Sequence, residues 1–286
     1  MLTRRRFGSL LVTAAGAVLT GRVKLGADTT RSGLAFGVQT YTIRDRLKDL
    51  PATLRLIREI GYASVEGYPF IYDRPAKELK AVIANSGLTV PSGHFDYLDL
   101  EERVDYAAEL GLEYMICTAI PRPQWTSIEG YQEAAKHLNK VAPKVLAAGL
   151  KFGYHPHNCD FKPLKGGRGF DVLMQNLDPS VRLELDIYWA VEAGQDPLVL
   201  MREHHDRLAL IHIKDRKQAT GFTYDPADAR AAHFTEAGSG TIDWKMLLGE
   251  AKRLGVKQYF VDQDGSDLPI EESLRINWNY LSQLSL

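Results

Sequence analysis

The sequence contains four pairs of residues whose side chains are typical of catalytic and metal-binding sites. The two members of each pair are separated by a single residue, and on a β-strand this spacing places both side chains on the same face. Each pair lies at the end of a short apolar run. The pairs are His155 and His157, Glu184 and Asp186, His212 and Lys214, and Asp262 and Asp264.

Imidazole and carboxylate groups together are the usual ligands of divalent transition ions. One ligand from each pair gives a predicted metal site of His155, Asp186, His212 and Asp262. We expect Mn2+ or Zn2+, with Co2+ or Mg2+ as alternatives. A single residue of this kind is more often structural, and Asp186 as a helix cap or Asp262 as a turn residue would be examples. Their occurrence on four successive predicted strands favours a site.

The pairs must be positioned by strands that alternate with helices. Glycines that end helical stretches support this division, because glycine readily adopts the left-handed conformation that closes a helix. They are Gly61, Gly87, Gly111, Gly149 and Gly255. The predicted strands are 34–41, 63–67, 89–95, 113–118, 150–155, 181–187, 209–214 and 257–262. The predicted helices are 49–60, 74–86, 99–110, 127–148, 169–177, 197–206, 242–254 and 269–284.

Eight strands alternating with eight helices predict an α/β fold, either a doubly wound sheet or a (β/α)8 TIM barrel. The barrel is favoured because no GxGxxG turn follows the first strand. We therefore expect a single barrel domain over residues 34–286. In such a barrel the carboxyl ends of the strands form the active site, which is where the polar pairs lie.

The first 30 residues differ from the rest of the chain. Thr3-Arg4-Arg5-Arg6-Phe7 precedes an apolar stretch over 10–19, which is too short for a transmembrane helix. This segment resembles a twin-arginine export signal, which implies a periplasmic protein, tethered to the inner membrane if the signal is retained. The alternative is a basic tail. Cys117 and Cys159 are interpreted as buried thiols rather than a disulfide.

The composition and charge of the chain indicate what kind of molecule it binds. The chain has 286 residues, a formal net charge of −1 and no long run of like charges. A nucleic-acid surface needs a concentrated excess of Lys and Arg, so such a partner is not expected. A small carbohydrate fits better, and a homo-oligomer remains open.

The motifs resemble the xylose isomerase-like barrel superfamily, in its sugar phosphate isomerase/epimerase branch. The matching stretches are GVQTYTIRD, IGYASVEGY, GYHPHNCDFKP, LELDIYWAVEAGQDP, LIHIKD, FTEAGSGTIDW and VDQDG. The resemblance implies a metal site with Glu, Asp, His and Glu ligands, of which Asp186 and His212 match. His155 and Asp262 replace the two glutamates. The family's two-glutamate epimerase mechanism is therefore not transferred.

The resemblance still implies that the protein removes a proton next to the carbonyl of a sugar or keto sugar, through a metal-bound enediolate. The candidate base is His157 or Glu184, with Lys214 as acid or electrostatic partner. Reprotonation would give an isomerase or epimerase. The alternatives are a lyase eliminating from a 3-keto sugar, glycoside or cyclitol, and an exported barrel that binds sugar or metal without turnover. An abasic-site nuclease on this fold is disfavoured by the neutral charge.

Other polar and aromatic residues near predicted strand ends suit a sugar ring. The expected substrate-binding residues are Gln39, Tyr41, Glu66, His94 and Trp189. The stretch GSGTIDW, with Gly238 and Gly240, suggests either a phosphate-binding loop or a turn leading into a helix.

Overall fold

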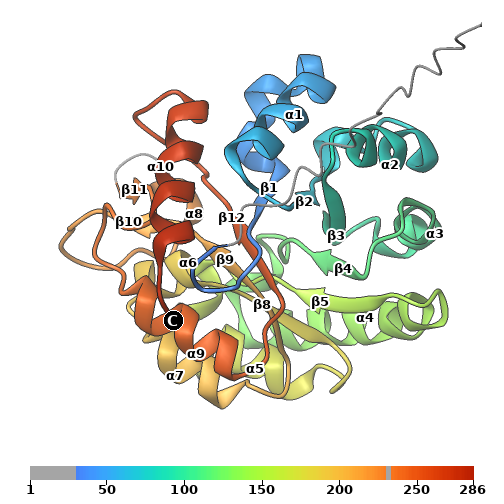
Figure 1. Cartoon of the computed structure of the whole chain (residues 1–286). Helices are drawn as coiled ribbons and strands as arrows, with labels where there is room; N and C mark the ends of the chain where they lie inside the picture. Colours follow the sequence, from blue (N-terminus) through green and yellow to red (C-terminus); the bar gives the residue numbers. More distant parts are fainter. Residues whose placement is uncertain (1–29, 230–232) are drawn as a thin grey trace, which may run out of the picture.

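The computed structural model describes residues 30–229 and 233–286, and eight parallel strands close into a barrel (Figure 1). Their order around the barrel is β1-β12-β9-β8-β5-β4-β3-β2. The predicted (β/α)8 barrel is confirmed, with each expected strand present. The strands are β1 (Gly37–Gln39), β2 (Ser64–Gly67), β3 (Thr89–Phe95), β4 (Tyr114–Cys117), β5 (Lys151–Tyr154), β8 (Arg182–Asp186), β9 (Leu208–Ile213) and β12 (Gln258–Val261).

The eight predicted helices are also present and surround the barrel (Figure 1). They are α1 (Leu50–Ile60), α2 (Ala76–Asn85), α3 (Leu100–Leu110), α4 (Ile128–Ala147), α5 (Gly169–Asn176), α7 (Pro197–Glu203), α9 (Trp244–Arg253) and α10 (Ile270–Gln283). Short elements that were not predicted decorate the loops. They are the helices α6 (Ile187–Glu192) and α8 (Pro226–Ala229), the 3-10 helices η1 (Thr40–Asp49), η2 (Pro69–Ile71), η3 (Gln124–Thr126) and η4 (Asn158–Phe161), and the hairpins β6 (Pro163–Leu164)–β7 (Gly167–Arg168) and β10 (Asp215–Arg216)–β11 (Phe234–Thr235).

The helices are held to the barrel by one apolar face each. In α1 the buried positions include Leu50, Leu54 and Ile57, which recur every three or four residues and so form one stripe. At its end Gly61 has φ 130°, and a Cβ there would lie 2.3 Å from the Trp278 ring of α10. Glycine is therefore required both for the backbone conformation and for the close packing.

The barrel interior is divided into an apolar layer and a polar layer. The apolar layer consists of Tyr114, Ile116, Leu210 and Phe260. Phe260 pairs in register with His212, and their rings lie 6.2 Å apart, so the polar layer follows at the carboxyl ends of the strands. The apolar layer shields the polar groups from water on one side, which strengthens the electrostatic interactions among them.

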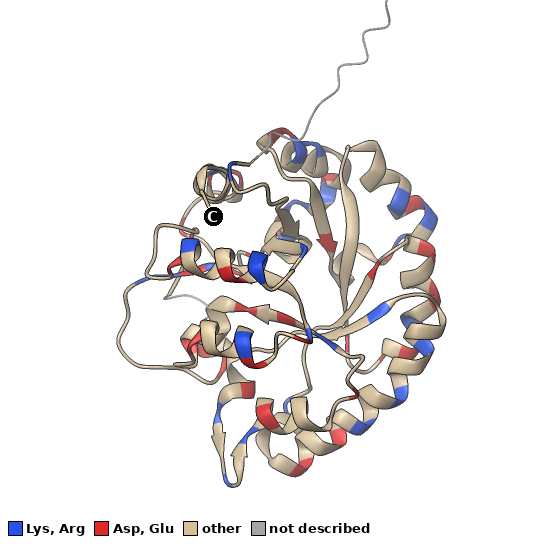
Figure 2. Cartoon of the chain, turned by 60° about the horizontal axis from the view of Figure 1, so that its bottom comes forward, with Lys and Arg blue, Asp and Glu red and all other residues tan. Residues whose placement is uncertain are grey.

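The outer helices carry Lys and Arg interspersed with Asp and Glu (Figure 2). Both cysteines are free and buried, as expected. Among the described residues, no helix is long and apolar enough to cross a membrane. The predicted export signal falls on residues 1–29, which lie outside the described part of the chain.

Candidate active site

A buried cluster of imidazoles and carboxylates forms the polar layer. His94 Nε2 lies 2.5 Å from Glu184 Oε2, and His212 Nε2 lies 2.6 Å from Glu66 Oε2. His155 Nδ1 lies 3.2 Å from the same Glu184 oxygen. All five side chains are at least 96% buried, and they come from five different strands or strand ends. Two predicted substrate-binding residues, Glu66 and His94, therefore lie inside the ionisable cluster.

Lys214 forms a second centre beside the first. Its ammonium lies 2.7 Å from Asp262 and 3.0 Å from Asp186, and it also donates a short hydrogen bond to Asp264. The nitrogen lies 5.1 Å from the centre of the Trp189 ring. Burial lowers the pKa of Lys214, but the three carboxylates outweigh burial and hold its pKa well above the usual value. Lys214 therefore remains a cation in the folded protein.

The pKa values of the cluster follow from its mixture of charges. Burial lowers the pKa of His94 and His212, but Glu66 and Glu184 outweigh burial and raise both. Burial favours the neutral form of Glu184, yet His212 and His94 hold its pKa well below the usual range. Burial and His212 together lower the pKa of His155 to about 4. The cluster therefore holds ionised and neutral ligand groups side by side.

Two overlapping sets of side chains have the composition of a metal site. One set is His94, His155, Glu184 and His212, and the other is Asp186, His212 and Asp262; within each set the ligand atoms lie within 4.8 Å of one another. The structure thus brings all four predicted ligands together around His212. His155 belongs to the first set, and its Nε2 lies 4.0 Å from Asp186 Oδ2.

The donor atoms fit a divalent cation. Several buried atoms in the cluster lack a hydrogen-bond partner although nitrogens or oxygens lie nearby, and unpaired buried polar atoms are rare in folded proteins. Convergent oxygens and nitrogens without hydrogen-bond alignment are what an ion requires. The atoms are Glu66 Oε1, His155 Nδ1, Glu184 Oε1 and Asp262 Oδ1.

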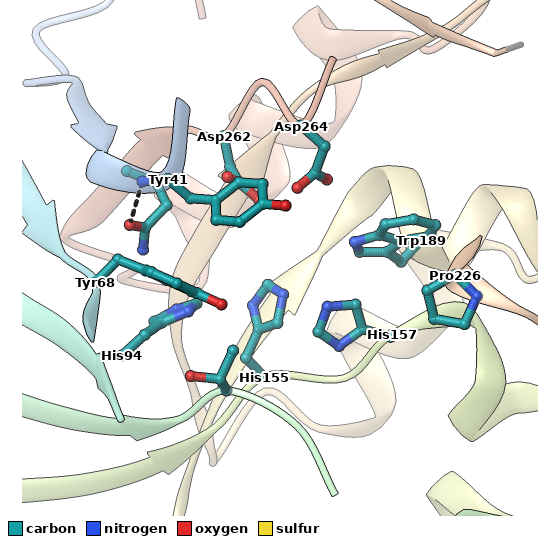
Figure 3. Close-up of a pocket in the computed structure, with 11 residues that line it drawn as sticks. Tyr41, Tyr68, His94, His155, His157, Trp189, Pro226, Asp262 and Asp264 are labelled. Carbon is teal, nitrogen blue, oxygen red and sulfur yellow. Dashed lines mark hydrogen bonds between the residues drawn. The ribbon is translucent and has the colours of Figure 1, made fainter. Parts of the chain in front are cut away.

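A pocket opens above this cluster (Figure 3). Predicted site residues that line it are Gln39, Tyr41, His94, His155, His157, Trp189 and Asp262. Tyr68, Thr118 and Pro226 line it as well and were not predicted. Tyr68 follows Glu66 at the same one-residue spacing as the pairs, so that rule could have found it. Thr118 and Pro226 carry no comparable chemical signal.

The predicted position of Tyr41 was wrong in one respect. Strand β1 ends at Gln39, and Tyr41 lies in the first turn of η1, because the Gln39 side-chain oxygen accepts a hydrogen bond from the Tyr41 backbone N–H at 3.1 Å. Gln39 also donates to Glu66 Oε2 at 2.7 Å. It therefore connects the pocket wall to the ionisable cluster.

Asp186 has two roles in the structure. Its Oδ1 accepts a hydrogen bond from the Trp189 backbone N–H at 2.9 Å and so caps α6, while Oδ2 faces Lys214. The cap alternative considered from sequence is therefore confirmed, and it fixes Trp189 at the pocket. At the other end of α6, buried Glu192 accepts hydrogen bonds from Arg216 and Thr223. This holds in place the loop that carries Pro226.

The GSGTIDW stretch is a structural turn. The Asp215 carboxylate accepts hydrogen bonds from the backbone N–H groups of Gly238 and Ile242 and from the Trp244 indole. A Cβ on Gly240 would lie 2.2 Å from the same carboxylate. Because the Gly238 and Ile242 N–H groups already bind Asp215, these contacts favour the turn leading into a helix over the phosphate-binding loop.

Comparisons with known proteins identify relatives and solved structures of similar fold. The chain is 24% identical over 234 residues to an inosose dehydratase of Geobacillus thermodenitrificans, covering 68% of this chain and 76% of the relative. A solved sugar phosphate isomerase/epimerase from Parabacteroides distasonis superposes with a TM-score of 0.74 at 23% identity, covering 87% of this chain and 97% of the other.

A solved 3-keto-D-glucoside 4-epimerase from E. coli has a TM-score of 0.64 at 17% identity and covers 87% of this chain and 98% of the other. At these identities the structural likeness establishes the fold. The family model described as xylose isomerase-like TIM barrel matches residues 54–262, which is more than half of the chain. The protein is therefore a member of the xylose isomerase-like TIM barrel family.

Proposed function

We propose that this protein is a divalent-metal-dependent enzyme that removes a proton next to the carbonyl of a sugar or keto sugar. This step is shared by isomerases, epimerases and dehydratases, which are the activities named for its relatives. The main support is the set of convergent, unpaired donor atoms at the base of a pocket. A bound ion would polarise the carbonyl and stabilise negative charge on its oxygen.

We place the ion between His94, His155, Glu184 and His212. The reason is Lys214, whose ammonium lies within 3.0 Å of both Asp186 and Asp262 and competes with a second cation there. In the first set, the described ion pairs of Glu184 are with histidines alone. This proposal retains two of the predicted ligands, His155 and His212. It assigns Asp186 and Asp262 to orient Lys214, which acts through its charge.

Among the chain's own residues, His157 is the proposed base. It lines the pocket outside the carboxylate cluster, and its ring lies 4.9 Å from the His155 ring and 5.5 Å from the Trp189 ring. The hydroxyls of Tyr41 and Tyr68 point into the pocket from the other side (Figure 3). The phenols are the proposed proton donors.

This arrangement favours elimination as the second step. Burial raises the pKa of Tyr68 to about 12, so its phenol serves as a proton donor and not as a second base. In elimination the base takes the proton, a carbon–carbon double bond forms, the β carbon–oxygen bond breaks, and the leaving oxygen receives a proton from the phenol. An epimerase needs groups on both faces that can exchange roles, and it remains the second candidate.

The pocket favours an uncharged sugar over a sugar phosphate. Among the described residues that line it there is no Lys or Arg, whereas Asp262 and Asp264 are present. A phosphate group would find no Lys or Arg side chain among these residues to bind its oxygens. An exported enzyme, as the N-terminal segment suggests, would also meet free sugars rather than metabolic phosphates.

Metal analysis of the purified protein tests the proposed ion. We expect one ion per chain, lost in His94→Gln, His155→Gln and Glu184→Gln but retained in Asp262→Asn. Loss in Asp186→Asn and Asp262→Asn with retention in Glu184→Gln would place the ion in the other set. A chain that binds no divalent metal in any form would refute metal dependence.

The reaction is tested with an inosose and with 3-keto-glucosides in D2O. Elimination predicts loss of water or of the glycosidic group and the ultraviolet absorbance of a conjugated enone. Epimerisation predicts an unchanged covalent skeleton with one deuterium incorporated. If neither occurs while both ligands bind, the protein binds sugar without turnover.

A further inference from the structure

Three aromatic residues form a continuous surface that extends from the pocket to the outside of the molecule. We call Tyr41, Tyr68 and Phe70 the aromatic platform. The ring centres lie 5.0 Å apart for Tyr41–Tyr68, 4.9 Å for Tyr68–Phe70 and 5.9 Å for Tyr41–Phe70. Tyr41 and Tyr68 line the pocket, whereas Phe70 is 52% exposed.

The exposure of Phe70 follows from its local structure. Pro69 begins the short helix η2, and the two residues that follow Phe70, Ile71 and Tyr72, are buried at 2% and 6% exposure. The Tyr72 hydroxyl packs against Gly67 and Gly93, where a Cβ would lie within 2.4 Å of it. The turn is therefore anchored on its inner side, and Phe70 is held facing outward.

Within the platform, Tyr41 is held in place by several contacts. The Arg44 guanidinium lies 4.3 Å from the centre of the Tyr41 ring, and Arg44 donates hydrogen bonds to the backbone oxygens of Tyr41 and Asp264 at 2.9 and 2.8 Å. Tyr41 is further fixed by Gln39. A surface that is already ordered loses little side-chain entropy when a ligand binds, which makes it effective for recognition.

We propose that the aromatic platform binds a second sugar ring, so that the substrate is a keto-glycoside of at least two rings. This inference rests on the proposed function, which places the first ring in the pocket. A pyranose ring presents an apolar C–H face that can lie on Phe70, while its hydroxyls remain in water.

Continuity with the pocket carries the argument. A single exposed phenylalanine is common on protein surfaces and indicates nothing alone. Phe70, however, contacts both tyrosines of the pocket wall, so a chain of linked rings leaving the pocket on that side must pass over it. The opposite wall is formed by Trp189 of α6 and Pro226 of α8, which are separate elements (Figure 3).

Binding measurements test this site without requiring turnover. Isothermal titration compares methyl β-glucoside with cellobiose and maltose on the metal-loaded, full-length protein. We expect the better disaccharide to bind about tenfold more tightly than the monosaccharide, as expected for burying one ring face. Phe70→Ala should remove this preference, and Phe70→Trp should keep it. Met246→Ala removes a comparably exposed apolar side chain, 48% exposed on α9, and should change nothing.

The outcomes separate this inference from the proposed reaction. Equal affinities for one-ring and two-ring sugars, or a disaccharide preference that survives Phe70→Ala, would overturn the second-ring site. A preference only for 4-nitrophenyl β-glucoside would also overturn it and would indicate an aryl group instead. A Phe70-dependent preference in a protein without turnover would support the site while refuting the proposed reaction.

Discussion

Lys214→Met is expected to destabilise the protein strongly at neutral pH. The substitution removes a fully buried ammonium that lies within hydrogen-bond distance of Asp186, Asp262 and Asp264. Methionine retains most of the side-chain length and can still pack against the rings of Tyr188 and Trp189. The variant therefore isolates the loss of charge from the loss of packing.

The expected magnitude follows from the uncompensated carboxylates. Removing one partner of a buried ion pair destabilises by about 3–5 kcal/mol, because the remaining charge stays buried. The free energy of unfolding of a typical domain is about 5–15 kcal/mol, so the loss is a large fraction of the total. Urea unfolding of wild type and variant, both with chelator present, measures it.

The pH dependence of this difference has a definite sign. In the wild type, burial opposes ionisation of Asp262 but Lys214 and His212 hold its pKa well below the usual value. Its contribution to stability is present above the unfolded pKa of about 4 and is lost as the pH falls through the folded value. The wild type and Lys214→Met should therefore differ most near pH 7 and converge on acidification.

Two results would contradict this reasoning. A loss below about 1 kcal/mol at pH 7 would mean that the three carboxylates do not depend on the ammonium. A difference that is still unchanged well below pH 4 would mean that the loss comes from packing. The double variant Lys214→Met with Asp264→Asn should recover part of the stability, because one unpaired charge is removed with its partner.

Three further predictions follow from the described contacts. A divalent ion at 100 times its Kd should stabilise the fold by about 2.7 kcal/mol, or roughly 5–10 °C in Tm. The affinity for the ion should rise with pH, because His94 and His212 must lose protons to bind it. An affinity that does not change with pH would exclude both histidines as ligands. Burial raises the pKa of Asp160 from 3.8 to about 6, so the stability of the wild type relative to Asp160→Asn is greatest below pH 4 and falls by about 3 kcal/mol as the pH rises through 6. Denaturant unfolding at each pH measures this difference in stability. A difference that does not change with pH would contradict the prediction. Gly61→Ala should destabilise the fold by roughly 2–4 kcal/mol, because the position combines a positive φ with a clash against Trp278. Gly255→Ala should lose only about 1 kcal/mol, because this position has a positive φ but open space around it. Equal shifts in melting temperature for the two variants would exclude the clash.

The barrel was predictable because its signals are local. Five of the eight outer helices, α1, α2, α3, α4 and α9, end next to a glycine with positive φ, and the eight strand–helix units give one closed arrangement. The short helix α6 was missed because its signal is a single capping contact from Asp186, a residue that the sequence already suggested as a ligand. The early end of β1 was missed for a similar reason, since it depends on the Gln39 side chain.

The residues of the candidate site could be predicted from the sequence better than their positions relative to one another. The one-residue spacing indicated which side chains face the barrel mouth, and all of these lie in or beside the buried cluster. Which groups pair with which depends on distances between strands far apart in sequence. The position of the Lys214 ammonium between Asp186 and Asp262 is of this kind, and no spacing rule reveals it.

The hydrogen bonds of Asp215 have a consequence for mutational scans of this protein. Asp215 is adjacent to Lys214 in sequence, is fully buried, and organises the turn before α9 through two backbone N–H groups and the Trp244 indole. Replacing Asp215 would release that turn and displace Lys214, and the proposed turnover would fall although Asp215 belongs neither to the pocket lining nor to either set of metal ligands. An inactive Asp215 variant would thus mimic a lost catalytic group, and only its lowered melting temperature would reveal an architectural fault.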